Sequence, residues 1–125
     1  MSASRPLAFA GILALFAAAS CSGSSTAPYG GGTGAGACSG TNAAVAVCDD
    51  RYSPTMSTIT KGTSITWTWK GTHMHSVTFQ NGTLAGTTSS TMSSGSYTLA
   101  FPNAGTFNYQ CNVHGSVMSG TVTVN

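Results

Sequence analysis

The sequence has few charged residues, and their scarcity excludes several classes of function. Only 5% of its 125 residues are charged, with two acidic and four basic side chains, whereas about 25% is usual for a soluble domain. So few cations cannot neutralise a row of phosphates, which excludes nucleic-acid binding. The acidic residues are the neighbours Asp49 and Asp50, which leaves little basis for the paired-carboxylate chemistry of glycosidases or aspartic proteases.

The sequence also lacks a hydrophobic run long enough for a stable membrane-spanning helix. Its longest run covers residues 7–19, and a span needs about 20 residues. The run follows a basic residue and precedes small residues, which is the pattern of an export signal. Because the Ala-Ser-Cys ending resembles the lipobox of bacterial lipoproteins, we expect a lipoprotein-like signal peptide over residues 1–20 and acylation of Cys21. Ordinary cleavage after Ala19 or Ser20 is the alternative.

The next segment has the composition of a linker. Residues 21–37 consist mostly of serine, glycine, alanine and threonine. Such a segment has little to bury, and ordering its backbone would cost about 1 to 2 kcal/mol per residue. We therefore expect residues 21–37 to be a flexible tether and residues 38–125 to form one small folded domain.

Alternation of apolar and polar residues predicts strands in this domain. In residues 64–69 every second side chain is large and apolar, which is the pattern of a half-buried strand. Turn residues separate such segments at spacings typical of a sandwich. The sequence therefore predicts an all-β, antiparallel β-sandwich of six or seven strands, in which only residues 84–94 could hold a helical turn or an irregular loop. The other strand-like segments are residues 43–47, 76–79, 97–101, 106–111 and 120–124.

Residue types that bind soft metal ions gather near the C-terminus. Cys111, His114 and Met118 fall within one short segment, and His75 begins another predicted strand. One thiolate, two imidazoles and a thioether are the ligands of copper sites that have three ligands in a plane and a weak axial sulfur. Since Cys111 ends one strand and Met118 opens the next, a single loop supplies three of these ligands.

Other interpretations of these residues stay open at this point. Lone cysteines and methionines often pack in cores, and lone histidines often lie on surfaces. Zinc binds one cysteine and two histidines as well, although Met118 would then have no role. A Cys–His pair can act as a nucleophile, but no orienting partner is evident. We interpret His73 as a surface neighbour, with an accessory copper contact or a pH-sensitive group as the alternatives.

These motifs resemble those of the cupredoxins, the family of plastocyanin, amicyanin and pseudoazurin. The similar segments are His-Ser-Val-Thr-Phe at residues 75–79 and Gly-Thr-Phe-Asn-Tyr-Gln-Cys-Asn-Val-His at residues 105–114. They lie within a stretch of similarity that covers residues 40–125. The resemblance implies an eight-strand Greek-key β-sandwich that binds one type 1 copper and transfers single electrons. The ligands that it implies are His75, Cys111, His114 and Met118.

The sequence departs from the family pattern beside these ligands. Three residues separate His114 from Met118, instead of two or four, which affects the axial geometry and the reduction potential. Relatives have Pro-His-Asn at the upstream ligand, whereas this chain has Met74-His75-Ser76. The asparagine steadies the cysteine loop in relatives, and Ser76 is the candidate to replace it.

Four cysteines in an exported chain ordinarily predict two disulfides. If Cys21 is acylated and Cys111 binds copper, Cys38 and Cys48 remain and flank the first predicted strand. A disulfide between them would stabilise the fold by about 2 to 3 kcal/mol. The alternative is that both stay reduced.

These predictions lead to one main hypothesis and two alternatives. The main hypothesis is an exported, periplasmic or cell-surface blue-copper protein that is not an enzyme. It transfers single electrons between transient redox partners, is a monomer, and contacts the membrane only through its lipid anchor. The first alternative is an envelope protein that stores or delivers copper without a redox partner, which the closeness of His73 to His75 favours. The second is a metal-free adhesive sandwich.

Overall fold

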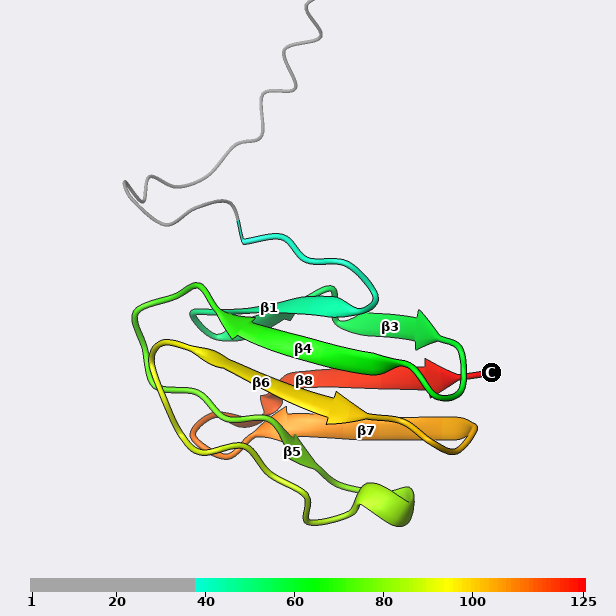
Figure 1. Cartoon of the computed structure of the whole chain (residues 1–125). Coiled ribbons are helices and arrows are strands. Elements are labelled where there is room, and N and C mark those ends of the chain that lie inside the picture. The colour runs from blue at the N-terminus through cyan, green and yellow to red at the C-terminus, as the bar shows by residue number, and fades with distance from the viewer. Residues whose placement is uncertain (1–37) are drawn as a thin grey trace, which may run out of the picture. The chain divides into compact units, whose positions relative to one another are not determined.

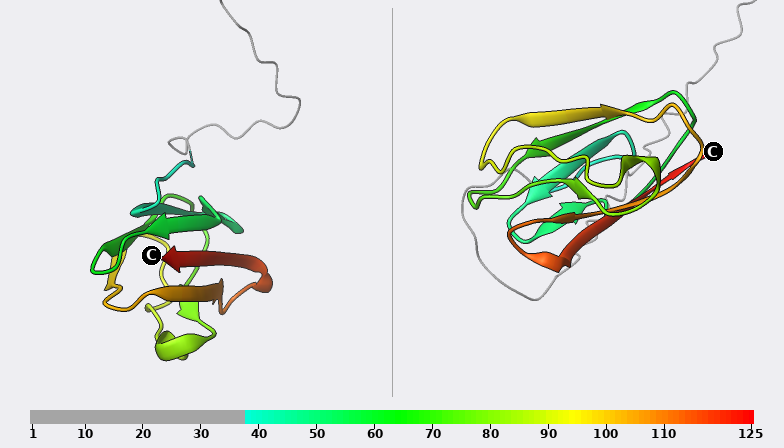
Figure 2. Two further views of the ribbon diagram at one scale, coloured as in Figure 1. Left: turned by 90° about the vertical axis from the view of Figure 1, so that its right-hand side faces the viewer. Right: turned by 90° about the horizontal axis from the view of Figure 1, so that it is seen from below.

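The computed structural model describes residues 38–125, which form two β-sheets packed face to face (Figures 1 and 2). Eight strands and one 3-10 helix occur among these residues, and no α-helix does. The predicted all-β sandwich is thereby confirmed. The elements are β1 (Ala44–Cys48), β2 (Arg51–Ser53), β3 (Met56–Ile59), β4 (Ser64–Trp69), β5 (Thr78–Phe79), η1 (Gly82–Leu84), β6 (Ser96–Ala100), β7 (Gly105–Cys111) and β8 (Gly115–Val124).

The chain crosses repeatedly between the two sheets. One sheet has the strand order β2-β1-β4-β6 and the other has the order β3-β8-β7-β5. Every connection from β2 to β7 therefore changes sheet, which gives the Greek-key sandwich. Four strand pairs are antiparallel, as predicted, but β1–β4 and β3–β8 are parallel. These two pairs differ from the prediction because each joins strands that are distant in the sequence, so no hairpin turn fixes their relative direction.

The strand β4 shows how the sequence pattern builds the core. Ile65, Trp67 and Trp69 are buried between the sheets, while the residues between them are only partly buried. The Trp67 ring makes edge-to-face contacts with the rings of Tyr109, at 5.5 Å, and Phe79, at 5.9 Å. Burial of each large apolar side chain contributes about 1.5 to 3 kcal/mol, so this cluster holds the two sheets together.

The strand β1 is buried on both faces. Four consecutive residues from Val45 to Cys48 are buried, although the sequence predicted weak alternation there. The reason is that residues 38–41 cover the outer face. Cys38 forms a disulfide with Cys48, with 6.0 Å between the Cα atoms, and Gly40 packs so closely on this strand that a side chain at position 40 would collide with its backbone.

The long hairpin of β7 and β8 separates the turn that carries Cys111 from the C-terminus. Cys111 pairs with Gly115 at its turn, whereas Gly105 pairs with Val124 at its other end. The C-terminus therefore lies opposite the turn that carries Cys111 (Figure 1). We call the end with this turn the metal end.

Some predictions fall on residues outside the described part of the chain. These are the signal peptide over residues 1–20, the tether over residues 21–37 and the acylation of Cys21. Within residues 38–125, no helix is long and apolar enough to cross a membrane.

Candidate metal centre

The turn between β7 and β8 brings two predicted ligands together. The strand β7 ends at Cys111, and its pairing with β8 is irregular between Gln110 and Cys111, a feature that re-aims side chains. Gly115 follows with a φ of 62°, which glycine adopts without the strain that a side chain would cause. As a result, Cys111 is fully buried, and its Sγ lies 3.5 Å from His114 Nδ1.

The third predicted ligand, His75, comes from the loop between β4 and β5. It is fully buried, and its backbone exchanges two hydrogen bonds with Met92, at 2.9 and 3.0 Å. The indole N–H of Trp69 donates a third hydrogen bond to the His75 carbonyl oxygen, at 3.2 Å. The fold therefore fixes the position of this imidazole independently of any metal.

The three ligand atoms form a compact triangle. His75 Nδ1 lies 3.2 Å from His114 Nδ1 and 3.8 Å from Cys111 Sγ, and the third side measures 3.5 Å. A point equidistant from all three atoms lies about 2 Å from each, which is close to the usual length of metal–nitrogen and metal–thiolate bonds. One soft metal ion therefore fits between His75, Cys111 and His114, which we call the inner triangle.

Ser76 joins the two loops that supply these ligands. Its Oγ accepts a hydrogen bond from the backbone N–H of Asn112, at 2.9 Å. Its own N–H points at Cys111 Sγ, at 3.5 Å, and its carbonyl oxygen accepts a hydrogen bond from the Tyr52 hydroxyl. The side chain of Ser76 thus makes the loop-to-loop contact that the sequence assigned to it.

The surroundings favour the neutral forms of His75 and Tyr52. Burial lowers the pKa of His75, and the neighbouring His114 lowers it further. His75 therefore stays neutral and keeps a lone pair for a metal. Burial, with the nearby Cys111 as a further cause, raises the pKa of Tyr52, so its hydroxyl keeps the proton that it donates to Ser76.

Met118, the predicted axial ligand, lies in β8 beyond the turn. It is 1% exposed and belongs to the same buried cluster as Cys111. This position does not test whether Met118 is a ligand, so that role stays a prediction. Of the other methionines in the described residues, Met92 packs against the core, and Met56 and Met74 are exposed.

The sequence did not predict that both acidic residues lie at the metal end. Asp49 Oδ1 accepts hydrogen bonds from the N–H groups of Thr72 and His73, each at 2.8 Å, and these bonds are the main cause that lowers the pKa of Asp49 to about 2. Asp50 Oδ1 lies 3.2 Å from His114 Nε2. We call Asp49, Asp50 and His73 the outer cluster. No motif marks it, because it forms only when the β1–β2 turn meets the loop after β4.

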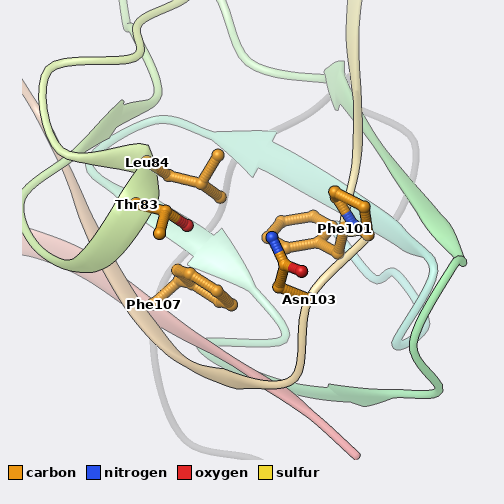
Figure 3. Close-up of a pocket in the computed structure, with 6 residues that line it drawn as sticks. Thr83, Leu84, Phe101, Asn103 and Phe107 are labelled. Atoms are coloured by element: carbon orange, nitrogen blue, oxygen red, sulfur yellow. The ribbon is translucent and has the colours of Figure 1, made fainter.

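Exposed apolar residues also occur next to the ligands in the sequence. The His114 side chain is 27% exposed, and the exposed hydrophobic residues of the domain include Met74, Val113 and Val117, which neighbour the ligands in the sequence. By contrast, a cavity of about 190 Å³ between η1 and the β6–β7 turn is lined by Leu84, Phe107 and their neighbours and contains none of the inner triangle (Figure 3).

A Greek-key sandwich with one buried cysteine and two imidazoles at one end defines a cupredoxin-type copper protein. Comparison with known proteins agrees with this class. The family model of copper-binding proteins of the plastocyanin/azurin family matches residues 42–125. The chain belongs to the plastocyanin/azurin family of copper-binding proteins.

Solved structures of amicyanin are similar to this chain. An oxidised methionine-to-lysine variant of amicyanin is 28% identical, with a TM-score of 0.61, and the match covers 66% of this chain and 80% of that one. An oxidised proline-to-glycine variant is 30% identical, with a TM-score of 0.58 and the same coverage. No curated protein sequence matches significantly. The family transfers electrons rather than catalysing reactions, so the chain is a copper-binding electron-transfer protein and not an enzyme.

Proposed function

We propose that this protein is an exported carrier of single electrons with one type 1 copper. The inner triangle holds the ion, and Met118 supplies the axial sulfur. The observation that carries the proposal is the set of ligand separations of 3.2, 3.5 and 3.8 Å between two imidazole nitrogens and one cysteine sulfur. When bound, copper supplies a Cu(II)/Cu(I) couple, which a thiolate and two imidazoles serve in both oxidation states.

The fold keeps the ligands in place while the charge of the site changes. His75 is fixed by backbone hydrogen bonds to Met92, and Cys111 is held at the end of a strand. Ser76 ties these two segments together. Because the ligands have little freedom to move, little reorganisation accompanies the gain or loss of an electron.

We propose that electrons enter and leave through His114. Its ring is partly exposed and is a ligand of the inner triangle, so it offers the shortest route to the solvent. The described residues carry three cations, Arg51, Lys61 and Lys70, against Asp49 and Asp50, which leaves a formal charge of three minus two, or +1. Docking to redox partners is therefore transient and depends weakly on salt.

The location of the protein is also part of the proposal. The apolar run before Cys21 supports export, and its Ala-Ser-Cys ending supports acylation of Cys21 and anchoring at the periplasmic or cell surface. Intact-mass analysis of the mature protein tests this: a diacylglyceryl-modified N-terminal Cys21 is expected, and an unmodified N-terminus at residue 20, 21 or beyond would contradict the anchor.

Titration of the purified metal-free protein with Cu(II) tests the copper centre. We expect one intense visible absorption band from the thiolate–copper bond, complete at one ion per chain. Cys111→Ser should lose the band, whereas Lys61→Gln, at an exposed turn, should keep it. A colourless product with the unaltered protein, or a strong band with Cys111→Ser, would refute the centre.

A second function, copper storage or delivery, is favoured by the outer cluster beside the inner triangle. Voltammetry of the copper-loaded protein, together with a copper chelator that competes for Cu(I), separates the two functions. A carrier should give fast, reversible electron exchange and keep its copper when reduced. Rapid loss of copper on reduction would instead indicate delivery.

A further inference from the structure

Every acidic side chain and every histidine of the chain lies at the metal end. The sequence has two acidic residues and three histidines. His75 and His114 belong to the inner triangle, and Asp49, Asp50 and His73 form the outer cluster. A chain with so few charged residues thus places both of its acidic side chains and its third imidazole beside one site.

Each carboxylate of the outer cluster lies at a distance from the His73 ring that one metal ion can bridge. His73 Nδ1 lies 3.8 Å from Asp49 Oδ1 and 3.9 Å from Asp50 Oδ1. An ion with bonds of about 2 Å bridges atoms that are up to about 4 Å apart. Imidazole and carboxylate groups both bind Cu(II). The side chains of His73, Asp49 and Asp50 are 62%, 37% and 64% exposed, respectively, so an ion reaches them directly from solution.

His75 is an independent sign of a ligand at this place. Its side chain is 0% exposed, and its Nε2 has no hydrogen-bond partner within the described residues. This nitrogen faces the outer cluster, 3.7 Å from Asp49 Oδ1, while Nδ1 of the same ring faces the inner triangle. The ligand atoms of Asp49, His73 and His75 all lie within 4.8 Å of one another. A buried polar atom without a partner is costly, and binding a metal ion would satisfy it.

We propose that the outer cluster, together with His75 Nε2, captures Cu(II) from solution, and that the ion then moves to the inner triangle, where His75 binds it through Nδ1. The inference rests on the copper centre proposed above. A neutral imidazole has one free lone pair, so His75 binds an ion through Nε2 or through Nδ1, one at a time. The Cys111 thiolate makes the inner triangle the tighter copper site, which sets the direction of transfer.

Rapid mixing of the metal-free protein with Cu(II) alone tests this capture step. The thiolate band reports only the inner triangle, because the outer cluster contains no sulfur. With the unaltered protein, the rate of colour development should reach a plateau as the Cu(II) concentration rises, since transfer follows capture. His73→Gln should abolish the plateau and slow colour development about tenfold or more at low Cu(II) concentration. Lys61→Gln, at an exposed turn away from the metal end, is the control and should behave as the unaltered protein.

The final spectrum separates capture from folding. His73 is exposed, so His73→Gln should reach the same final band and the same copper content of one ion per chain. A rate that stays proportional to Cu(II) concentration in the unaltered protein, or an unchanged rate in His73→Gln, would overturn the inference. Two tightly bound ions in the fully coloured protein would also overturn it, because the shared ring permits one. Absence of colour in every variant would overturn the copper centre itself, and the capture site with it.

Discussion

The buried hydroxyl of Ser76 gives a sharp test of how the ligand loops are held. Ser76→Ala removes the acceptor for the Asn112 N–H at 2.9 Å and leaves the backbone contacts of Ser76 in place. Because Asn112 itself is exposed, water replaces part of the lost bond, and we expect the free energy of unfolding to fall by about 1 to 2 kcal/mol. For a domain of this size, each kcal/mol lowers Tm by about 4 to 8 °C.

A second buried serine provides the matched control. The Ser57 hydroxyl is buried but has no hydrogen-bond partner within the described residues, so Ser57→Ala should leave stability unchanged or raise it. Urea denaturation of the metal-free proteins measures both changes. In the copper-loaded proteins, Ser76→Ala should also release copper to a chelator about 10 to 100 times faster. If Ser76→Ala is as stable as Ser57→Ala and keeps copper equally well, Ser76 does not hold the loops.

Two further predictions concern pH and packing. The pKa of His75 is lowered in the fold, so the unfolded chain binds a proton at this residue more readily than the folded chain. The metal-free protein should therefore have its full stability above about pH 6.5 and lose stability as the pH falls below that value. Because the pKa of Asp49 is lowered to about 2, stability should decrease further as the pH falls from about 4 to about 2. Urea titrations across this pH range check both effects, and constant stability between pH 7.5 and 5.5 would contradict the prediction for His75. Gly120→Ala should destabilise the fold by about 1 to 3 kcal/mol in thermal denaturation, because the new Cβ atom at position 120 would collide with the buried Tyr109 ring. Ser119→Ala at the exposed neighbour should not, and equal stability of the two variants would refute this packing.

The strands with strong alternation were predictable from the sequence. In β4, Ile65 and Trp67 face the core as expected, because side chains alternate between the faces of a strand. Alternation did not predict the short strands β2 and β3, since three or four residues carry too little pattern; they bring the total to the eight strands that the family resemblance implied. The parallel direction of β1 beside β4 was not predictable either, because alternation is the same in both directions.

The inner triangle was predictable as a set of residue types, but its surroundings were not. Cys111 and His114 are close in sequence, so the turn alone brings them together. The position of Asp50 beside His114 depends on the β1–β2 turn, where Asp50 has a φ of 65°. Nothing in a stretch of sequence indicates which remote turn will meet the site, so such contacts appear only with the complete fold.

The opposite placement of the C-terminus and the ligand turn has a practical consequence for handling the protein. Gly105, which pairs with Val124, lies six residues before Cys111 in β7, a length of about 20 Å along the strand. A linker attached at Asn125 would hold the molecule on an electrode or a fusion partner while His114 faces the bulk solution. Such a conjugate keeps the proposed electron port at His114 free for a soluble donor and separates it from the support by the length of the hairpin.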